Sequence, residues 1–319
     1  IEIYLQTGYV PSPWSIYKEV RKLKPGHCMI MDLNSKNIQF EQYWDLQSPK
    51  LSALSYTEAK DQLHELLKNA VKIRLQSDVP FGSFLSGGID SALVSAIANK
   101  IVNGNLKTFT IGFDNPEYDE SVLASKFSEI IGSKHQETIC SAKDLIELFP
   151  SFFKTYGEPF ADSSQLPTYL LSEYVSKEVK VVLTGDGADE LFFGYPRYHA
   201  CQARLKLKFL KEIKTCISPQ AFALLLNSKS DVFSYLLSVS GHKFGYLRKE
   251  KQVEFIGRLS ERIDFGDVDT SNKHWRPLLD HRFYLQKQLF QISDNCAMWH
   301  AIESRPALLG LQNFDLLWG

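Results

Sequence analysis

The stretch Phe84-Leu85-Ser86-Gly87-Gly88-Ile89-Asp90-Ser91 decides how this chain folds. It follows an apolar segment, Val79 to Leu85, that predicts a strand, and it runs into Ile89 to Ala98, where apolar residues recur at helical spacing. The two glycines permit a tight turn and let a ligand approach the backbone closely. Free N–H groups at a helix start attract an anion. The sequence therefore predicts a strand, a glycine turn and a helix N-terminus that together bind phosphate.

The acid at position 90 separates this turn from the common phosphate loop. The chain has no G-x-x-x-x-G-K-[ST] pattern, so no loop lysine reaches the phosphates. Asp90 would repel a phosphate unless a cation lay between them, which makes Asp90 a candidate magnesium ligand. Asp is also common as a capping residue at helix starts, so this stretch alone leaves both interpretations open.

The run Ser86-Gly87-Gly88-Ile89-Asp90-Ser91 resembles the SGGxDS loop of the ATP pyrophosphatases. These enzymes grip the pyrophosphate of ATP while a substrate attacks the α-phosphate. The superfamily includes asparagine, GMP, NAD and argininosuccinate synthetases and several tRNA-modifying enzymes, and the loop does not choose among them. The resemblance implies that Asp90 holds Mg²⁺ and that the loop binds ATP through Leu85, Ser86, Gly87, Gly88, Asp90 and Ser91.

Composition narrows the set of superfamily members that this chain could represent. The chain has 319 residues with 44% hydrophobic content, which is enough for a large core and one or two domains. Its 36 basic and 37 acidic residues nearly balance, which argues against nucleic acid as the main partner and so against the tRNA-modifying relatives. The 5 cysteines form no CxxC pair, as expected of reduced thiols in a cytoplasmic protein. No apolar run approaches a membrane-spanning length, and no signal peptide is visible.

The first part of the chain carries turn and short-strand patterns. Cys28 to Leu33 and Ile38 to Phe40 predict a hairpin, and Ile16 to Leu23 predicts a short helix. The runs Gly8-Tyr9-Val10-Pro11 and Tyr43-Trp44-Asp45-Leu46 resemble the end of the glutaminase domain of glutamine-dependent asparagine synthetases. We therefore expect residues 1–49 to be the C-terminal remnant of a glutaminase domain of the N-terminal nucleophile type. The family's N-terminal Cys nucleophile precedes the start of this chain.

The remainder, residues 50–319, is expected to be the ATP-pyrophosphatase domain of an asparagine synthetase, truncated at its C-terminus. Strand and helix patterns alternate through its first half, which predicts a parallel sheet with right-handed crossovers. Ligands of such sheets sit at the carboxyl ends of the strands, where Ser86, Gly112 and Thr184 should converge. The pattern from His199 to Ser271 is helical. The predicted class is thus α/β, a three-layer nucleotide-binding fold of the adenine nucleotide α-hydrolase type, with a helical C-terminal part and a small β remnant at the N-terminus.

A second polar motif, Thr184-Gly185-Asp186-Gly187-Ala188-Asp189-Glu190, follows the apolar strand Val179 to Leu183. Its acids would repel one another unless a cation or a positive substrate group were present; an acidic surface loop is the alternative. The motif resembles the family's SG[ED]GxDE loop. That resemblance implies that Asp189 joins Asp90 in holding magnesium, that Asp186 takes the position of the acid linked to forming the acyl-adenylate, and that the nucleotide contacts Thr184 and Gly185.

Three weaker matches complete the resemblance. In the family, the strand that corresponds to the one holding Ile111 packs against the adenine. An apolar residue at this position is also expected of any buried strand, so Ile111 is assigned by resemblance only. The runs Pro159-Phe160-Ala161-Asp162 and Pro167 to Ser172 match a segment that borders the family's ATP and aspartate clefts, where Asp162 or Ser163 as a helix cap is the alternative. Asp294 to Arg305 resembles a helix of the family. Where the family continues VPFLD, however, this chain has Pro306 to Gly310, one residue short and without the Asp. The family's downstream catalytic Lys cannot be assigned, because no lysine follows Lys287.

Together these motifs resemble a glutamine-hydrolysing asparagine synthetase. The implied reaction is attack of an aspartate β-carboxylate on ATP, giving aspartyl-AMP and pyrophosphate, followed by transfer of ammonia from glutamine to give asparagine. The implied cofactors are ATP and Mg²⁺, and the implied partners are aspartate and glutamine or ammonia. The resemblance allows a homodimer and implies neither nucleic acid nor membrane as a partner. This chain alone is expected to lack glutaminase activity. Two alternatives stay open: a related amide-forming synthetase of the β-lactam synthetase or peptide cyclase type, and a non-catalytic ATP-binding fragment.

Overall fold

The computed structural model describes residues 4, 8–46, 53–195, 278–281, 285 and 289–310. The chain forms two compact units. The first comprises Ile1–Ser48, Glu158–Ala161 and Tyr195–Phe283, and the second comprises Pro49–Gly157, Asp162–Gly194 and Tyr284–Gly319. The predicted identities of residues 1–49 and 50–319 remain predictions, and the predicted helical segment from His199 to Ser271 lies outside the described residues. In the part of the chain that is described, no helix is long and apolar enough to cross a membrane.

The first unit contains the predicted hairpin. Strands β1 (His27–Met31) and β2 (Ile38–Gln42) pair antiparallel, with Met29 opposite Phe40. The predicted helix from Ile16 to Leu23 is wrong, because the segment forms bends and turns. The Ser15 hydroxyl donates to the carbonyls of Tyr17 and Val20, both at 3.0 Å. Such local side-chain bonds compete with the helical backbone ladder.

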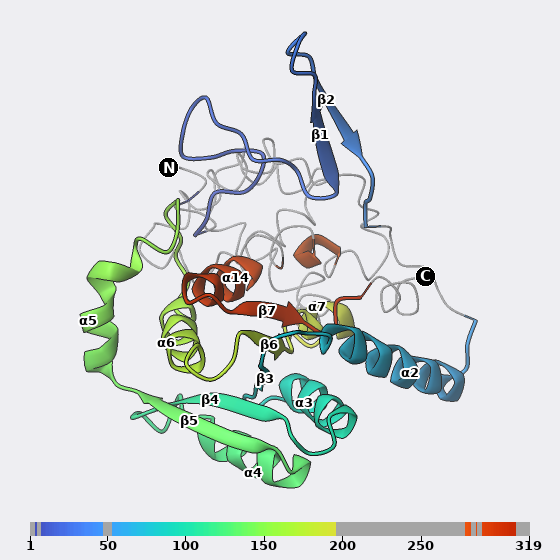
Figure 1. Cartoon of the computed structure of the whole chain (residues 1–319), viewed down its shortest axis with the longest axis vertical. Coiled ribbons are helices and arrows are strands. Elements are labelled where there is room, and N and C mark those ends of the chain that lie inside the picture. Colours follow the sequence, from blue (N-terminus) through green and yellow to red (C-terminus); the bar gives the residue numbers. More distant parts are fainter. Residues whose placement is uncertain are drawn as a thin grey trace, which may run out of the picture. The chain divides into compact units, whose positions relative to one another are not determined.

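The second unit is built on a five-stranded sheet with the order β5-β4-β3-β6-β7 (Figure 1). Every neighbouring pair is parallel, which confirms the predicted α/β class with a parallel sheet. The central strand β3 pairs with β4 on one side and with β6 on the other, so the carboxyl ends of these strands lie at one edge. The strands are β3 (Phe81–Phe84), β4 (Lys107–Phe113), β5 (Lys134–Cys140), β6 (Val181–Thr184) and β7 (Glu303–Pro306).

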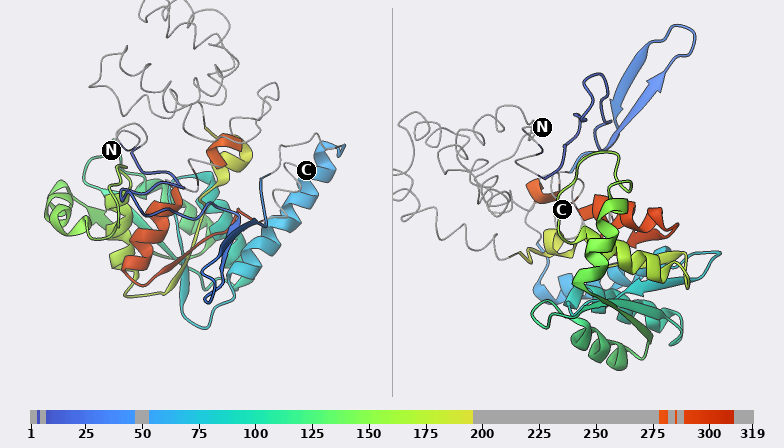
Figure 2. Two further views of the ribbon diagram at one scale, coloured as in Figure 1. Left: turned by 90° about the horizontal axis from the view of Figure 1, so that it is seen from above. Right: turned by 90° about the vertical axis from the view of Figure 1, so that its left-hand side faces the viewer.

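Helices cover both faces of this sheet and make three layers (Figures 1 and 2). On one face, α2 and α3 pack through Leu67, Val71 and Val94 against Leu183 of β6. On the other face, α6 and α14 close over Phe109 of β4. The helices of the second unit are α2 (Tyr56–Arg74), α3 (Ile89–Ile101), α4 (Ser121–Ile131), α5 (Ala142–Phe152), α6 (Gln165–Val175), α7 (Ala188–Phe192) and α14 (Phe290–Trp299).

The expected helix from Asp294 to Arg305 is only half correct. Helix α14 ends at Trp299, Ala301 adopts a left-handed φ of 55°, and Glu303–Pro306 then forms β7 beside β6. The Arg305 guanidinium donates to the backbone carbonyls of Arg74 and Gln76 at 2.8 and 2.7 Å. Pairing with β6 and these bonds to the end of α2 outweigh the local helical pattern. The two residues after Pro306, Ala307 and Leu308, are buried in the core despite the altered family pattern.

We expect Phe109→Ala to be strongly destabilising. Phe109 is fully buried, and its ring lies 2.6 Å from the place that a Cβ on Gly82 would occupy, so the surrounding atoms already fit closely around it. Removal of the ring should lower the free energy of unfolding by about 3–5 kcal/mol. The control is Phe40→Ala, because Phe40 is 65% exposed; its effect should stay within about 0.5 kcal/mol. Urea denaturation monitored by circular dichroism measures both variants, and equal effects would contradict the packing described.

Candidate functional site

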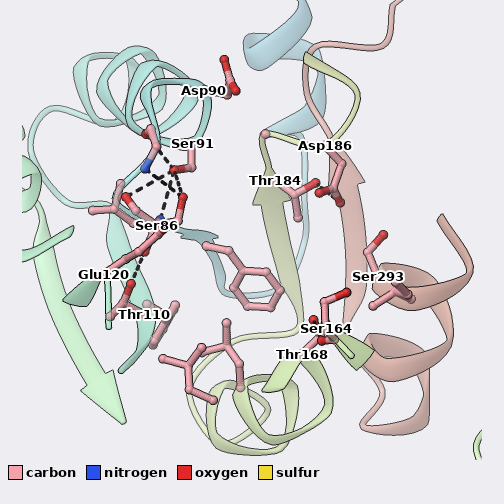
Figure 3. Close-up of a pocket in the computed structure, with 18 of the residues that line it drawn as sticks. Ser86, Asp90, Ser91, Thr110, Glu120, Ser164, Thr168, Thr184, Asp186 and Ser293 are labelled. Carbon is pink, nitrogen blue, oxygen red and sulfur yellow. Dashed lines mark hydrogen bonds between the residues drawn. The ribbon is translucent and has the colours of Figure 1, made fainter. Parts of the chain in front are cut away.

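A cavity of about 510 Å³ lies at the carboxyl ends of β3, β4 and β6 (Figure 3). The glycine turn, strand β4 and the acidic loop after β6 all line it, as the strand order requires. The predicted site residues that line the cavity are Leu85, Ser86, Gly88, Asp90, Ser91, Ile111, Thr184, Gly185 and Asp186. Gly87, Gly112 and Asp189 lie outside this lining. The structure thus brings most of the predicted residues together, while their binding roles stay predictions.

The glycine turn opens α3 as predicted. Gly88 is the N-cap residue in extended conformation and no side chain caps the helix, which leaves backbone N–H groups at the helix start for a ligand. Asp90 lies inside the first helical turn, so it is not the capping residue. The Ser86 and Ser91 hydroxyls lie 2.9 Å apart, and the Ser86 N–H donates to Ser91 Oγ at 3.0 Å. This serine pair holds the turn in shape.

Glu120 is a cavity residue that sequence reasoning missed. It lies just before α4, and its Oε2 accepts a hydrogen bond from the Gly87 N–H at 3.2 Å. The bond turns this N–H toward Glu120, and Gly87 does not line the cavity. No pattern in the sequence marks Glu120, because its partner lies 33 residues earlier in the chain.

The acidic loop reaches the start of α3 through a glycine. A Cβ at Gly185 would lie 2.9 Å from the Ser91 backbone nitrogen and 3.1 Å from the Asp90 carbonyl carbon. Only a residue without a side chain permits this approach of two backbone segments. Gly185 therefore brings the acidic loop against the helix start that carries Asp90.

Asp90 and Asp189 form the predicted carboxylate pair. Burial, and next the nearby Asp189 charge, raise the pKa of Asp90 above its ordinary value. A Cβ at Gly194 would overlap Asp189 Oδ1, so the glycine leaves room for this carboxylate, and the Gly194 N–H donates to the Asp189 carbonyl at 2.9 Å. Phe193, where the family has a small residue, adopts the left-handed φ of 62° that favours glycine.

This pair fits a magnesium ion that is also bound by phosphate. Mg²⁺ prefers oxygen ligands and is usually held by one or two carboxylates together with substrate phosphates and water. Among the described residues, no group of three or more His, Cys, Asp or Glu side chains could hold a metal ion on its own. The two repelling carboxylates are thus a suitable half-site for Mg²⁺ bound to ATP, and not for a metal held by protein alone.

The opposite side of the cavity carries Asp186 (Figure 3). Thr184 Oγ1 donates to Asp186 Oδ2 at 3.0 Å. Burial raises the pKa of Asp186, while hydrogen bonds from Thr184 and from Ser293 of α14 act in the opposite direction. Ser164, Thr168 and Ser293 line this side as well and were not predicted as site residues. Ser164 lies between the two runs that match the family, Thr168 lies within the second run, and Ser293 directly precedes Asp294.

We expect Gly185→Ala to destabilise the chain by about 1–3 kcal/mol, the usual cost of overpacking. The new methyl group would meet backbone atoms of Asp90 and Ser91, which cannot move without displacing α3. Gly157→Ala is the matched control, because a Cβ there has nothing within 4 Å. Thermal unfolding compares the two variants, and an unchanged Tm for Gly185→Ala would contradict the close approach of the two loops.

We also expect Asp90→Asn to raise the Tm at pH 7 when no Mg²⁺ is present. Because the pKa of Asp90 is raised, its charged form is less favourable in the folded chain than in the unfolded chain. The amide removes that penalty. The gain in Tm should shrink as the pH falls through the raised pKa of Asp90 toward the ordinary Asp pKa of about 3.9, because Asp90 then becomes protonated in the unfolded chain as well as in the folded chain. Scanning fluorimetry from pH 7 to pH 4 measures the difference, and a gain that grows on acidification would contradict this sign.

The chain is similar to several known proteins. A family model described as asparagine synthase matches residues 62–318. A putative glutamine-hydrolysing asparagine synthetase of Methanocaldococcus jannaschii is 40% identical over 198 residues, which cover 61% of this chain and 38% of that protein. The amidase chyE of Penicillium rubens is 33% identical, over 58% of this chain and 30% of that protein. The structure of NMN synthetase from Francisella tularensis has a TM-score of 0.31 and 20% identity, covering 43% of this chain and 58% of that one.

The chain spans about a third of the length of the curated relatives it matches, at 38% and 30%. The family model, in contrast, covers most of this chain, and its range contains the glycine turn, β4 and the acidic loop that meet in the cavity. Motif order, fold and family model therefore agree: the chain belongs to the asparagine synthase family.

Proposed function

We propose that this chain is the ATP-using part of an amide ligase that adenylates the aspartate β-carboxylate and passes the acyl group to ammonia derived from glutamine. One observation carries the proposal: a single cavity at the edge of the sheet collects the glycine turn, β4 and the acidic loop. A cavity of about 510 Å³ is within the usual range for a small-molecule or cofactor site. Membership of the asparagine synthase family supports the same reading.

The proposed phosphate end is the turn that opens α3. Its backbone N–H groups and the hydroxyls of Ser86 and Ser91 would hold the β- and γ-phosphates of ATP. Asp90 and Asp189 would hold Mg²⁺, which supplies positive charge to offset the pyrophosphate leaving group. Donors that are already in place need no reorganisation as this charge develops. Because the Gly87 N–H is bonded to Glu120, we assign Gly87 to the shape of the turn before ATP binds.

The proposed base end is apolar. Phe84, Phe109, Ile111 and Phe113 line the cavity along β3 and β4, and Tyr118 lies beside them. These side chains offer flat apolar surface suited to a purine, with Ile111 in the place that the family uses for adenine. In the proposed reaction, an aspartate oxygen attacks the α-phosphorus, and the bond to pyrophosphate breaks. Ammonia then attacks the acyl carbon, and AMP leaves. Asp186 lies at the end of β6, where it would face the acyl group.

The domain assignment belongs to this proposal as well. Residues 1–49 would be the end of a glutaminase domain and residues 50–319 the synthetase domain. A cytoplasmic location rests on cysteines that form no CxxC pair, and a homodimer rests on the family resemblance alone.

A second candidate is a related ligase that acts on another acid. The relative named amidase chyE, at 33% identity, and the altered run from Pro306 to Gly310 favour it. An ATP-binding chain without turnover is the remaining alternative, favoured by the same altered run.

We expect this chain to release pyrophosphate from Mg-ATP when aspartate and ammonium chloride are present. Asp90→Ala and Asp189→Ala should each lower the rate at least about 100-fold, because removing a preorganised charge contact typically costs that much. Asp78→Ala is the control, since Asp78 is an exposed acid outside the cavity, and it should keep the full rate. A coupled pyrophosphate assay gives the rates, and mass spectrometry identifies the amide.

The outcomes separate the candidates. Release that depends on aspartate and yields asparagine supports the main proposal, and release with other acids only supports the related ligase. ATP binding without release, weakened in both variants, identifies a nucleotide site without turnover. Neither binding nor release would overturn the assignment of the glycine turn.

A further inference from the structure

The wall of the cavity opposite the glycine turn is made of hydroxyl groups and one carboxylate. It consists of Ser164 and Thr168 on the α6 side, Thr184 at the end of β6, Asp186 in the loop that follows, and Ser293 on α14 (Figure 3). We call these five residues the acceptor wall, because the bonds described next leave them able to accept hydrogen bonds but not to donate them. On the other side, no side chain caps the start of α3, so the N–H groups of its first turn need an acceptor.

Each hydroxyl proton of the acceptor wall is already used inside the protein. Ser164 Oγ donates to Asp162 Oδ1 at 2.6 Å, and Thr168 Oγ1 donates to the Ser164 carbonyl at 2.8 Å. Thr184 Oγ1 donates to Asp186 at 3.0 Å. In all three bonds the hydroxyl is the donor and the partner is a carbonyl or carboxyl oxygen.

Ser293 follows the same rule. Its Oγ lies 3.1 Å from the Leu289 carbonyl and it also bonds to the Asp186 carboxylate, so its single proton goes to one protein acceptor or the other. What remains for a ligand is therefore a set of oxygen lone pairs and one carboxylate. No Lys, Arg or His is found among the described residues that line this cavity.

We propose that the acceptor wall binds a substrate nitrogen that donates hydrogen bonds, an ammonium or amine group, and excludes a substrate carboxylate. A carboxylate placed there would meet oxygen lone pairs without a donor, and desolvating it unpaired is costly. An ammonium carries three donors and a charge opposite to that of Asp186. The inference rests on the proposed function, in which two nitrogens qualify: the amino group of the acid substrate and the attacking ammonia.

The lack of free hydrogen-bond donors on the acceptor wall also orients the acid substrate. If its amino group lies on the acceptor wall, its reacting carboxylate is turned away from Asp186 and toward the donors of the glycine turn and the α-phosphate. If ammonia occupies the wall, Asp186 and the hydroxyls hold the nucleophile beside the acyl group. In both cases the wall acts by positioning, because none of its hydroxyl protons is available for transfer to a substrate.

Thr168→Val tests the proposal, because valine keeps the shape of threonine and removes the acceptor oxygen. The KM for the nitrogen substrate should rise about tenfold, the usual effect of losing one hydrogen bond to a charged group. The KM for ATP should stay unchanged. Thr168→Ser keeps the hydroxyl and should restore the wild-type KM. Ser176→Ala is the control, because Ser176 makes the same kind of bond to a helix carbonyl at the end of α6 and does not line the cavity.

The two KM values identify the nitrogen. A higher KM for aspartate with an unchanged KM for ammonium chloride assigns the wall to the amino group of the acid. The reverse assigns it to the attacking ammonia. A higher KM for ATP alone, or no change in any KM, overturns the proposal.

A binding measurement gives the same answer without turnover. With a non-cleavable ATP analogue such as α,β-methylene-ATP at saturation, aspartate or ammonium chloride should raise the Tm of the wild-type chain, because a ligand that binds the folded state stabilises it. Succinate, which has both carboxylates of aspartate and no amino group, should not. Stabilisation by succinate equal to that by aspartate overturns the proposal. If ATP raises the Tm and neither nitrogen compound does, the proposal for the acceptor wall is overturned, while the proposed nucleotide site is supported. If ATP has no effect, the proposed function fails with it.

Discussion

The site depends on the parallel pairing of β3 with both of its neighbours. Ser83 faces Thr108 of β4 and Leu183 of β6, so three strands end together at one edge of the sheet. The Ser83 hydroxyl is fully buried and lies 2.9 Å from Ser95 of α3, which ties the helix to the same strand. Because this register is fixed inside the core, the loops that follow the strands have little freedom, and their side chains meet in one cavity. The chemistry of the loops is thus positioned by packing that lies beneath them.

Groups in and beside the cavity reduce the stability of the fold. Asp90 and Asp189 repel each other, burial raises the pKa of Asp186, and Phe193 has a left-handed backbone. Apart from Phe193, these unfavourable features are charges that a cation or a donor would relieve. The core on both faces of the sheet, with Val71, Val94 and Phe109 fully buried, supplies the stability that offsets them. An arrangement that costs folding energy and lies in a cavity is typical of a binding or catalytic site.

The sequence predicted the strand-and-helix order and the meeting of the glycine turn with the acidic loop, because local patterns mark both. Glycines and acids directly after apolar strands are visible in sequence, and the parallel topology places them at one edge. It did not predict Glu120 or Ser293, and it placed Thr168 only in a segment that borders the clefts. These residues belong to the site only through contacts between distant segments, such as the bond from Gly87 to Glu120. The strand β7 was missed for the same reason, since Ser304 and Arg305 take their conformation from β6 and from the end of α2.

The place of β7 also has a consequence for how the sheet is completed during synthesis. The edge partner of β6 comes from Glu303–Pro306, so β6 stays an open edge until the ribosome has passed those residues. Contacts this far apart in the chain slow folding, because the intervening segment must be closed into a loop first. Among the described strand pairs of this sheet, β6 and β7 join residues that are farthest apart in the sequence, so we expect this pairing to form last.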